Sequence, residues 1–227
     1  MSMEWTRCFS KALTLSYDDG IESDVRLVEL LNRYGVKCTF NLNSGLGSDS
    51  RWDYKGFQVR RLDLPDAALL YKGHEIAVHG RTHAAPSQLA PDELYAEFSE
   101  DIRALTRLFG TKPVGMAYPY GDYNDAVVET LCGLGLQYGR TVEPSHDFAV
   151  QSDLMRFRPT CHHEDEMLPT LIEQFLAYDG DAPAIFYLWG HSYEFDGSRN
   201  WDAFERTLER LAGRDDVFYG TNAQVLL

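Results

Sequence analysis

Short apolar runs alternate with amphipathic segments along the chain, and this alternation constrains the fold more than any other feature. Runs such as 12–17 and 184–188 are typical of strands buried in a parallel sheet, whereas 24–34 and 91–109 repeat their apolar residues at helical spacing. Alternating strands and helices form βαβ units around a parallel sheet. About seven such strands predict an α/β fold, a single distorted (β/α) barrel that covers residues 1–227.

The same pattern predicts further elements between these segments. The other predicted strands are 36–42, 75–79, 114–118, 136–140, 154–159 and 217–219. The other predicted helices are 65–72, 124–134, 164–178 and 201–212. Residues 43–64 are rich in glycine and polar side chains, which predicts a long loop.

Charge and cysteine usage narrow the environment and the partners. The net charge of −14 argues against nucleic acid and anionic membrane as partners, because both select for basic surfaces. The four cysteines lie far apart without a CxxC pair, so free thiols in a reducing compartment are expected. Residues 1–10 lack a basic start followed by an apolar run, so we expect a cytoplasmic protein unless a leader has been removed.

Polar residues follow several predicted strands at the point where each strand ends. In TIM-barrel-like proteins the chemistry lies at the C-terminal ends of the strands. The residues that meet this condition are Asp18, Asp19, His79, His83, Tyr118, Tyr120 and His191. The sequence therefore predicts one site at this end of the barrel.

His79 and His83 stand four residues apart, a spacing that puts two imidazoles on one side of a helical turn. Neutral imidazole nitrogen is a good ligand for Zn²⁺ and related ions. Taken alone, the two histidines are equally well explained as polar residues of a loop.

Asp18 and Asp19 end the first predicted strand and precede Gly20. Successive side chains of a strand face opposite sides, so both carboxylates reach one site only if the chain turns, which glycine permits. A divalent cation relieves the repulsion between adjacent carboxylates. The alternative is a surface Asp-Asp-Gly turn. With two histidines at the end of a nearby strand, the pattern favours two aspartates and two histidines around one metal.

Four short motifs, in order along the chain, resemble those of the polysaccharide deacetylase family, the carbohydrate esterases that include chitin and peptidoglycan deacetylases. Residues 17–20 (Tyr-Asp-Asp-Gly) resemble the first motif, and 73–83 resemble the second, including its Gly-His-Glu-Ile start. Residues 117–121 (Ala-Tyr-Pro-Tyr-Gly) resemble the third, and 185–191, an apolar strand ending in histidine, resemble the last.

The resemblance implies a divalent metal held by Asp19, His79 and His83, with zinc as the expected ion and cobalt, nickel and manganese as alternatives. Three protein ligands with open positions are typical of a catalytic metal site. The resemblance also implies that Asp18 is the base that deprotonates a metal-activated water and that His191 is the acid for the leaving group.

The remaining implied roles concern the acetyl group. The backbone N–H of Tyr120 would stabilise the developing oxyanion. Leu188 and Trp189 match the apolar wall of the acetyl pocket. Asn43 and Tyr118, at the ends of the second and fourth predicted strands, are expected to bind substrate.

The chain departs from the family at Ala117, where an arginine that orients the catalytic aspartate usually stands. Arg158 is our candidate for a replacement from a later strand, with Arg156 as the second choice. The alternative for Arg158 is an ordinary surface ion pair. His162 and His163 follow the strand that holds Arg158, and they either line the cleft or form a solvated loop pair.

The predicted function is therefore a metal-dependent hydrolase that removes acetyl groups from N- or O-acetylated carbohydrate. One alternative keeps the site and changes the substrate to a small, non-peptide amide. The other is an inactive carbohydrate-binding protein.

Overall fold

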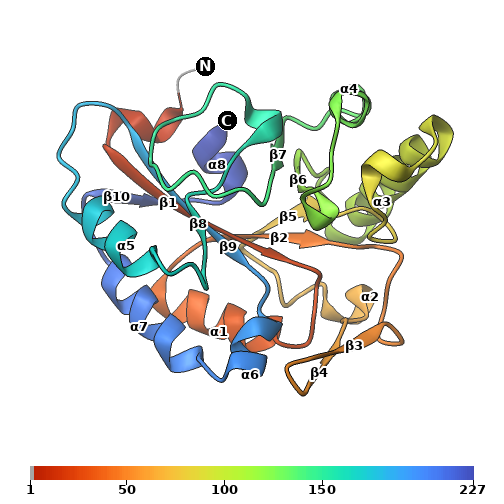
Figure 1. Ribbon diagram of the computed structural model, residues 1–227, viewed down its shortest axis with the longest axis horizontal. Coiled ribbons are helices and arrows are strands. Elements are labelled where there is room, and N and C mark those ends of the chain that lie inside the picture. Colours follow the sequence, from red (N-terminus) through yellow and green to blue (C-terminus); the bar gives the residue numbers. More distant parts are fainter. Residues whose placement is uncertain (1–2) are drawn as a thin grey trace.

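The structure of the protein, a computed structural model, describes residues 3–227. Its main sheet is parallel and curls into a half-barrel, with most helices packed on the outside and the C-terminal helix on the inner side (Figure 1). Seven strands follow one another in the order β7-β6-β5-β2-β1-β9-β8, and β10 pairs with β1. The predicted α/β fold, a distorted (β/α) barrel of about seven strands, is confirmed.

The elements have the following bounds. The strands of the main sheet are β1 (Lys11–Asp18), β2 (Cys38–Leu42), β5 (Glu75–Val78), β6 (Gly115–Ala117), β7 (Tyr138–Arg140), β8 (Cys161–His162), β9 (Ala184–Gly190) and β10 (Val217–Tyr219). The α-helices are α1 (Asp24–Tyr34), α2 (Leu64–Ala67), α3 (Pro91–Phe109), α4 (Asp125–Gly133), α5 (Leu168–Leu176), α6 (Tyr193–Ser198), α7 (Trp201–Leu211) and α8 (Asn222–Leu226).

The strand β1 is buried along its whole length and lies at the centre of the sheet. One edge pairs with β9 over residues 11–17. The other edge is shared, because β10 pairs with residues 11–13 and β2 with residues 15–18. Both edges are therefore occupied, which holds the C-terminal end of β1 rigidly where the cleft forms.

Successive side chains of β9 point to opposite faces of the sheet and belong to two different apolar clusters. Ile185, Tyr187 and Trp189 belong to the cluster that fills the inside of the curled sheet. Phe186 and Leu188 face the other way and belong to the larger cluster between sheet and helices. The period of two that strands impose on their side chains produces this division.

The two helices with the clearest sequence signals begin and end where the pattern predicts. The helices α1 and α3 match the predicted ranges 24–34 and 91–109. Gly35 (φ 67°) and Gly110 (φ 75°) follow them in the left-handed conformation, which glycine adopts at little cost and which ends a helix.

The predicted loop 43–64 instead contains a hairpin, β3 (Arg51–Tyr54) and β4 (Phe57–Arg60). Its two-residue turn has positive φ at both Lys55 (52°) and Gly56 (79°), the backbone of a type I′ hairpin turn. The hairpin lies beside α6 (Figure 1), and the Trp52 ring meets the Tyr193 ring edge-on at 5.4 Å. The prediction missed this hairpin because Lys-Gly is a weaker turn signal than Asn-Gly.

The prediction of a strand over 154–159 is wrong. Residues Leu154–Arg156 form a 3₁₀ turn, because the Asp153 carboxylate accepts a hydrogen bond from the Arg156 N–H at 3.2 Å. Only the end of the segment is extended, and Phe157 donates its N–H to the Gly139 carbonyl of β7 at 2.9 Å. The strand that pairs with β9 begins later, at Cys161.

Two further observations concern the helices and the cysteines. Across residues 3–227, every helix falls short of the length and apolarity that a bilayer crossing requires. The four cysteines are free, as predicted.

Candidate metal centre and active site

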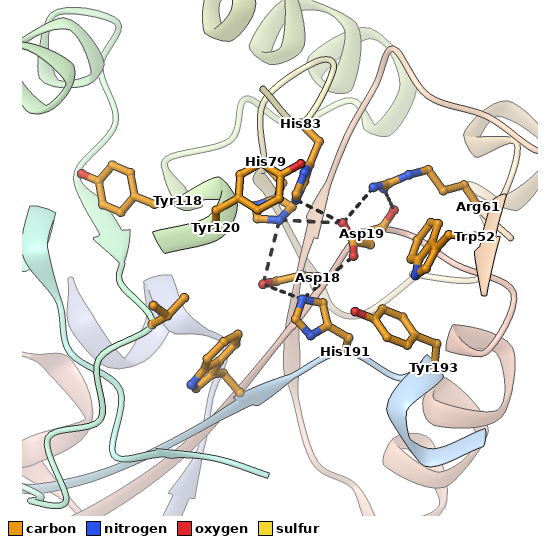
Figure 2. Close-up of a pocket in the computed structure, with 12 residues that line it drawn as sticks. Asp18, Asp19, Trp52, Arg61, His79, His83, Tyr118, Tyr120, His191 and Tyr193 are labelled. Carbon is orange, nitrogen blue, oxygen red and sulfur yellow. Dashed lines mark hydrogen bonds and ion pairs between the residues drawn. The ribbon is translucent and has the colours of Figure 1, made fainter. Parts of the chain in front are cut away.

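The ends of β1, β5, β6 and β9 converge on one cleft of about 530 Å³. Its lining residues are Asp18, Asp19, Trp52, Arg61, His79, His83, Tyr118, Tyr120, Val142, Trp189, His191 and Tyr193. Figure 2 shows the carboxylates and imidazoles of this set pointing toward one another at its centre. Most of the predicted site residues are therefore brought together from strands that are distant in sequence.

The backbone turns sharply at the end of β1, and this turn brings both aspartates into the cleft. Asp19 has a φ of 84° and Gly20 a φ of 65°, so the chain leaves the extended conformation at Asp19. The side chains of Asp18 and Asp19 therefore do not point to opposite faces, as successive residues of a strand would. Asp and Gly are among the residues that tolerate this region. The predicted turn is confirmed, although it begins one residue before the glycine.

Three side chains form a group that can hold a metal ion. Asp19 Oδ1 lies 3.8 Å from His79 Nε2 and 3.6 Å from His83 Nε2. Ligands that each lie ~2.1 Å from a tetrahedral zinc ion are ~3.4 Å apart, so the observed separations are close to those of a ligand set. One carboxylate and two imidazoles leave room for further ligands, as a catalytic site requires.

The segment between the two histidines is an irregular loop rather than the helical turn that their spacing suggested. Gly80 (φ 75°) and His83 (φ 58°) are left-handed, and this backbone returns the His83 ring toward His79. Asn43 holds the loop in place, because its Nδ2 donates to the carbonyls of His79 and Gly80 at 2.6 and 2.7 Å. The prediction that Asn43 binds substrate is wrong, since its amide is buried and occupied by these bonds.

The protonation of this group favours metal binding. His79 Nδ1 lies 2.8 Å from the Ala117 carbonyl, so it carries the proton and leaves the Nε2 lone pair directed at the cleft. Burial lowers the pKa of His79, and burial with the neighbouring His79 lowers the pKa of His83 to about 4, so both imidazoles are neutral near pH 7. Burial would raise the pKa of Asp19, but His191 and Arg61 outweigh it and lower that pKa to about 2.

Asp18 is held by two partners, one on each carboxylate oxygen. The Arg140 guanidinium forms a buried ion pair with Oδ2, and Asn41 Nδ2 donates to Oδ1 at 2.8 Å. Arg140 also lies over the Trp189 ring, 4.1 Å from its centroid. Arg140, at the end of β7, therefore makes the contact with Asp18 that was predicted for Arg158.

The prediction that Arg158 orients Asp18 is wrong. Arg158 is exposed, donates to the Pro144 carbonyl at 2.8 Å and lies 3.7 Å from Glu143. The second choice, Arg156, pairs with Asp125 and Asp153 on the surface. A signal for the correct residue was present, because Arg140 ends the predicted strand 136–140 as a catalytic-face residue should.

Arg61 is a site residue that the sequence prediction missed. Its NH2 lies 3.0 Å from Asp19 Oδ1, and its NH1 donates to the Asp19 carbonyl and to Asn43 Oδ1. Figure 2 shows it on the side of Asp19 opposite the imidazoles. Arg61 follows the unpredicted hairpin, so no strand end marked it in the sequence.

Of the residues expected to contact substrate, Trp189 and Tyr120 line the cleft and Leu188 does not. Leu188 is packed in the cluster that faces the helices, because it alternates with Trp189 along β9. Its assignment to the acetyl pocket is therefore wrong. Tyr118 borders the cleft but is almost fully buried, and its hydroxyl donates to the Met155 carbonyl at 2.7 Å.

Tyr120 occupies a left-handed position (φ 59°) in the turn after β6. The backbone bonds of this turn are donated by Gly121 and Asp122, which leaves the Tyr120 N–H outside them. The exposed Tyr120 ring meets the His83 ring edge-on at 4.5 Å. The oxyanion role of the Tyr120 N–H remains a prediction that this geometry permits.

His191 lies at the end of β9, on the side of the carboxylates opposite His83 (Figure 2). Its Nε2 is 3.9 Å from Asp18 Oδ2 and 4.0 Å from Asp19 Oδ2. Burial lowers its pKa, but Glu194 and the two aspartates outweigh burial and raise the pKa to about 9. His191 is therefore protonated near pH 7, the form in which an imidazole acts as an acid.

Comparison with solved structures identifies the class of this fold. A family 4 carbohydrate esterase from Streptomyces lividans superposes with a TM-score of 0.60 at 18% identity, over 93% of each chain. A family 4 pseudoenzyme from Bacillus anthracis superposes with a TM-score of 0.57 at 16% identity, over 96% of this chain and 66% of that one. The fold is that of the family 4 carbohydrate esterases, and it also occurs in a protein described as a pseudoenzyme.

The sequence comparison gives the family directly. Residues 9–139, more than half of the chain, match the polysaccharide deacetylase family model, and the chain belongs to that family. It is 29% identical over 124 residues to the peptidoglycan-N-acetylglucosamine deacetylase of Listeria monocytogenes, and 25% identical over 159 residues to chitin deacetylase 2 of Cryptococcus neoformans. These matches cover 54% and 66% of this chain but only 24% and 34% of those proteins.

Replacing His79 by alanine is expected to abolish high-affinity metal binding, because only two of the three ligands remain. Elemental analysis after dialysis against zinc measures the effect. The matched control is His146→Ala, which removes an exposed imidazole that pairs with Asp165. Full metal content in His79→Ala would refute the ligand assignment.

Replacing Arg140 by glutamine is expected to lower the unfolding free energy of the metal-free protein by about 3–5 kcal/mol, because it leaves the buried Asp18 carboxylate without its charged partner. Arg158→Gln should change it by less than about 0.5 kcal/mol, since that side chain is exposed. Urea denaturation of the two variants measures the difference. Equal losses would contradict the assignment of Arg140 as the partner of Asp18.

Proposed function

We propose that this protein is a zinc-dependent deacetylase that hydrolyses acetyl groups from N- or O-acetylated carbohydrates. The supporting observation is that one cleft places the candidate base and the candidate acid around a group of metal-binding donors. Asp18 Oδ2 lies 4.0 Å from His79 Nε2 and 3.9 Å from His191 Nε2. Cobalt, nickel and manganese suit the same donors, and zinc is proposed because two imidazoles and one carboxylate are typical zinc ligands.

In this proposal Asp19, His79 and His83 would hold a divalent metal, which would supply Lewis acidity and make water easier to deprotonate. Asp18 accepts the proton as the water attacks the acetyl carbon. Asn41 and Arg140 keep its two oxygens in a fixed orientation during this transfer.

The other residues act on the acyl oxygen and on the leaving group. The Tyr120 N–H donates a hydrogen bond to the oxyanion as negative charge develops on it. His191 then gives its Nε2 proton to the leaving sugar oxygen or nitrogen while the bond to the acetyl carbon breaks. The Trp189 and Tyr120 rings provide apolar walls for the methyl group.

The proposal predicts that purified, zinc-loaded protein releases acetate from at least one acetylated carbohydrate. An enzymatic acetate assay on chitooligosaccharides, peptidoglycan fragments and acetylated xylan measures this. Asp18→Asn should lower the rate by about 10²- to 10⁴-fold, because it removes the proton acceptor while keeping the shape of the side chain. Its metal content should stay that of the wild type, since Asp18 is not one of the three ligands.

Each alternative function has its own result in the same assay. If the protein hydrolyses small linear or cyclic amides but releases no acetate from any carbohydrate, its substrate is a small amide rather than an acetylated carbohydrate. Carbohydrate binding without hydrolysis of either class would instead identify an inactive binding protein. Wild-type activity in Asp18→Asn would remove Asp18 as the base.

A further inference from the structure

Three imidazoles surround one carboxylate behind the cleft. Glu194, at the start of α6, lies 3.0 Å from His162 Nε2 through Oε2 and 3.2 Å from His163 Nε2 through the same oxygen. Its Oε1 lies 3.4 Å from His191 Nδ1. The His191 backbone N–H also donates to Oε2 at 2.9 Å. His162 and His163 are therefore parts of a cluster at the edge of the active site rather than a solvated loop pair.

One hydrogen bond on the far side of His162 fixes its tautomer. Its Nδ1 accepts a hydrogen bond from the backbone N–H of Glu164 at 3.1 Å. A neutral imidazole that accepts at Nδ1 carries its proton at Nε2. The His162 N–H consequently faces the Glu194 carboxylate.

The same reasoning applies to His163. Its Nδ1 lies 3.2 Å from the Tyr17 hydroxyl. Burial raises the pKa of Tyr17 well above its ordinary value, so the phenol keeps the proton that it donates. With Nδ1 accepting, the His163 proton is at Nε2, where it faces Glu194; the reverse tautomer would oppose a nitrogen lone pair to a carboxylate.

These tautomers argue against a second metal ion. The ligand atoms of His162, His191 and Glu194 all lie within 4.8 Å of one another, which is close enough for a metal site. A metal needs a free lone pair on the imidazole nitrogen that faces it. At His162 that nitrogen carries a proton, because its other nitrogen accepts from the backbone. The imidazoles of this cluster stabilise the negative charge of the Glu194 carboxylate.

The electrostatics agree with this geometry. Burial of Glu194 would raise the pKa of its carboxyl, but the three imidazoles outweigh burial and lower that pKa well below its ordinary value. Burial lowers the pKa of His163 to about 4, so this ring is a neutral donor. The contacts of His163 Nε2 and His191 Nδ1 with Glu194 are close polar contacts rather than aligned hydrogen bonds, whereas the His191 backbone N–H donates an aligned hydrogen bond to Oε2.

We propose that Glu194 is a positioning residue for His191, and that His162 and His163 hold Glu194 in place for this purpose. Glu194 contacts the Nδ1 side of the His191 ring and so directs Nε2 toward the cleft, where a leaving group would depart. The inference rests on the proposed hydrolytic function, because it assigns a supporting group to the acid of that reaction. His191 gives one proton to the leaving atom and Asp18 takes one from water, so protons balance over a turnover.

A positioning role for the acid predicts a dependence on the leaving group. A sugar oxygen or nitrogen leaves poorly without a proton, whereas 4-nitrophenolate is a stable anion and needs no acid. Glu194→Gln keeps the volume of the side chain and removes its charge. It should lower kcat on the acetylated carbohydrate by about 10²-fold or more, with little change in KM, and leave hydrolysis of 4-nitrophenyl acetate and the zinc content near wild type.

Matched variants separate positioning from general damage. His162→Gln keeps an N–H donor toward Glu194 and should retain most carbohydrate activity, whereas His162→Leu should lose it in the same selective way. Glu143→Gln, which removes an exposed surface charge, serves as the control. An equal fall on both substrates, or no fall on either, would overturn the proposal.

A measurement without turnover tests the cluster even if no carbohydrate is cleaved. ¹⁵N NMR of the imidazoles should show the Nε2–H tautomer for His162 and His163, with an Nδ1–H signal of His191 that shifts in Glu194→Gln. Zinc titration should give one equivalent per chain. The opposite tautomer at His162, or a second equivalent that disappears in His162→Leu, would replace the positioning role with a second metal site.

Discussion

Two buried arginine–aspartate pairs at the end of β1 are the interactions on which the cleft depends. Arg140 pairs with Asp18 and Arg61 with Asp19, and none of the four side chains is more than 6% exposed. A single charge buried without a partner costs several kcal/mol. The two adjacent carboxylates can therefore lie side by side at the centre of the fold only because an arginine from β7 and another from the segment after the hairpin reach them.

The same pairs make two neighbouring aspartates chemically different. Asp18 has both oxygens occupied by protein donors and faces the cleft with a fixed orientation, as suits a base. Asp19 is held through its carbonyl and one oxygen by Arg61, and its carboxylate also faces the two imidazoles, as suits a metal ligand. Across the cleft, Glu194 contacts Nδ1 of His191, the ring nitrogen that faces away from the carboxylates. Each reactive group in the proposed reaction thus has a supporting contact already in place without substrate, the arrangement that electrostatic preorganisation requires.

The sequence predicted the parts of the protein that are local in the chain. Hydrophobic periodicity and terminal glycines located the main helices, and residues at strand ends located Asp19 and His79. It failed where a contact joins distant segments. Arg140 meets Asp18 across 122 residues and Arg61 meets Asp19 across 42. Nothing in a single sequence shows which arginine will reach a carboxylate, so Arg158 was chosen wrongly. Glu194 was not singled out because two of its three imidazole partners, His162 and His163, come from a distant segment.

The central claim is that Asp19, His79 and His83 form the ligand set of a catalytic metal. Zinc K-edge X-ray absorption of the loaded protein tests it most directly. The account predicts two imidazole nitrogens and additional oxygen donors at about 2.0–2.1 Å, with the imidazole signal halved in His83→Ala. Sulfur scattering at about 2.3 Å, or an imidazole signal unchanged in His83→Ala, would contradict it.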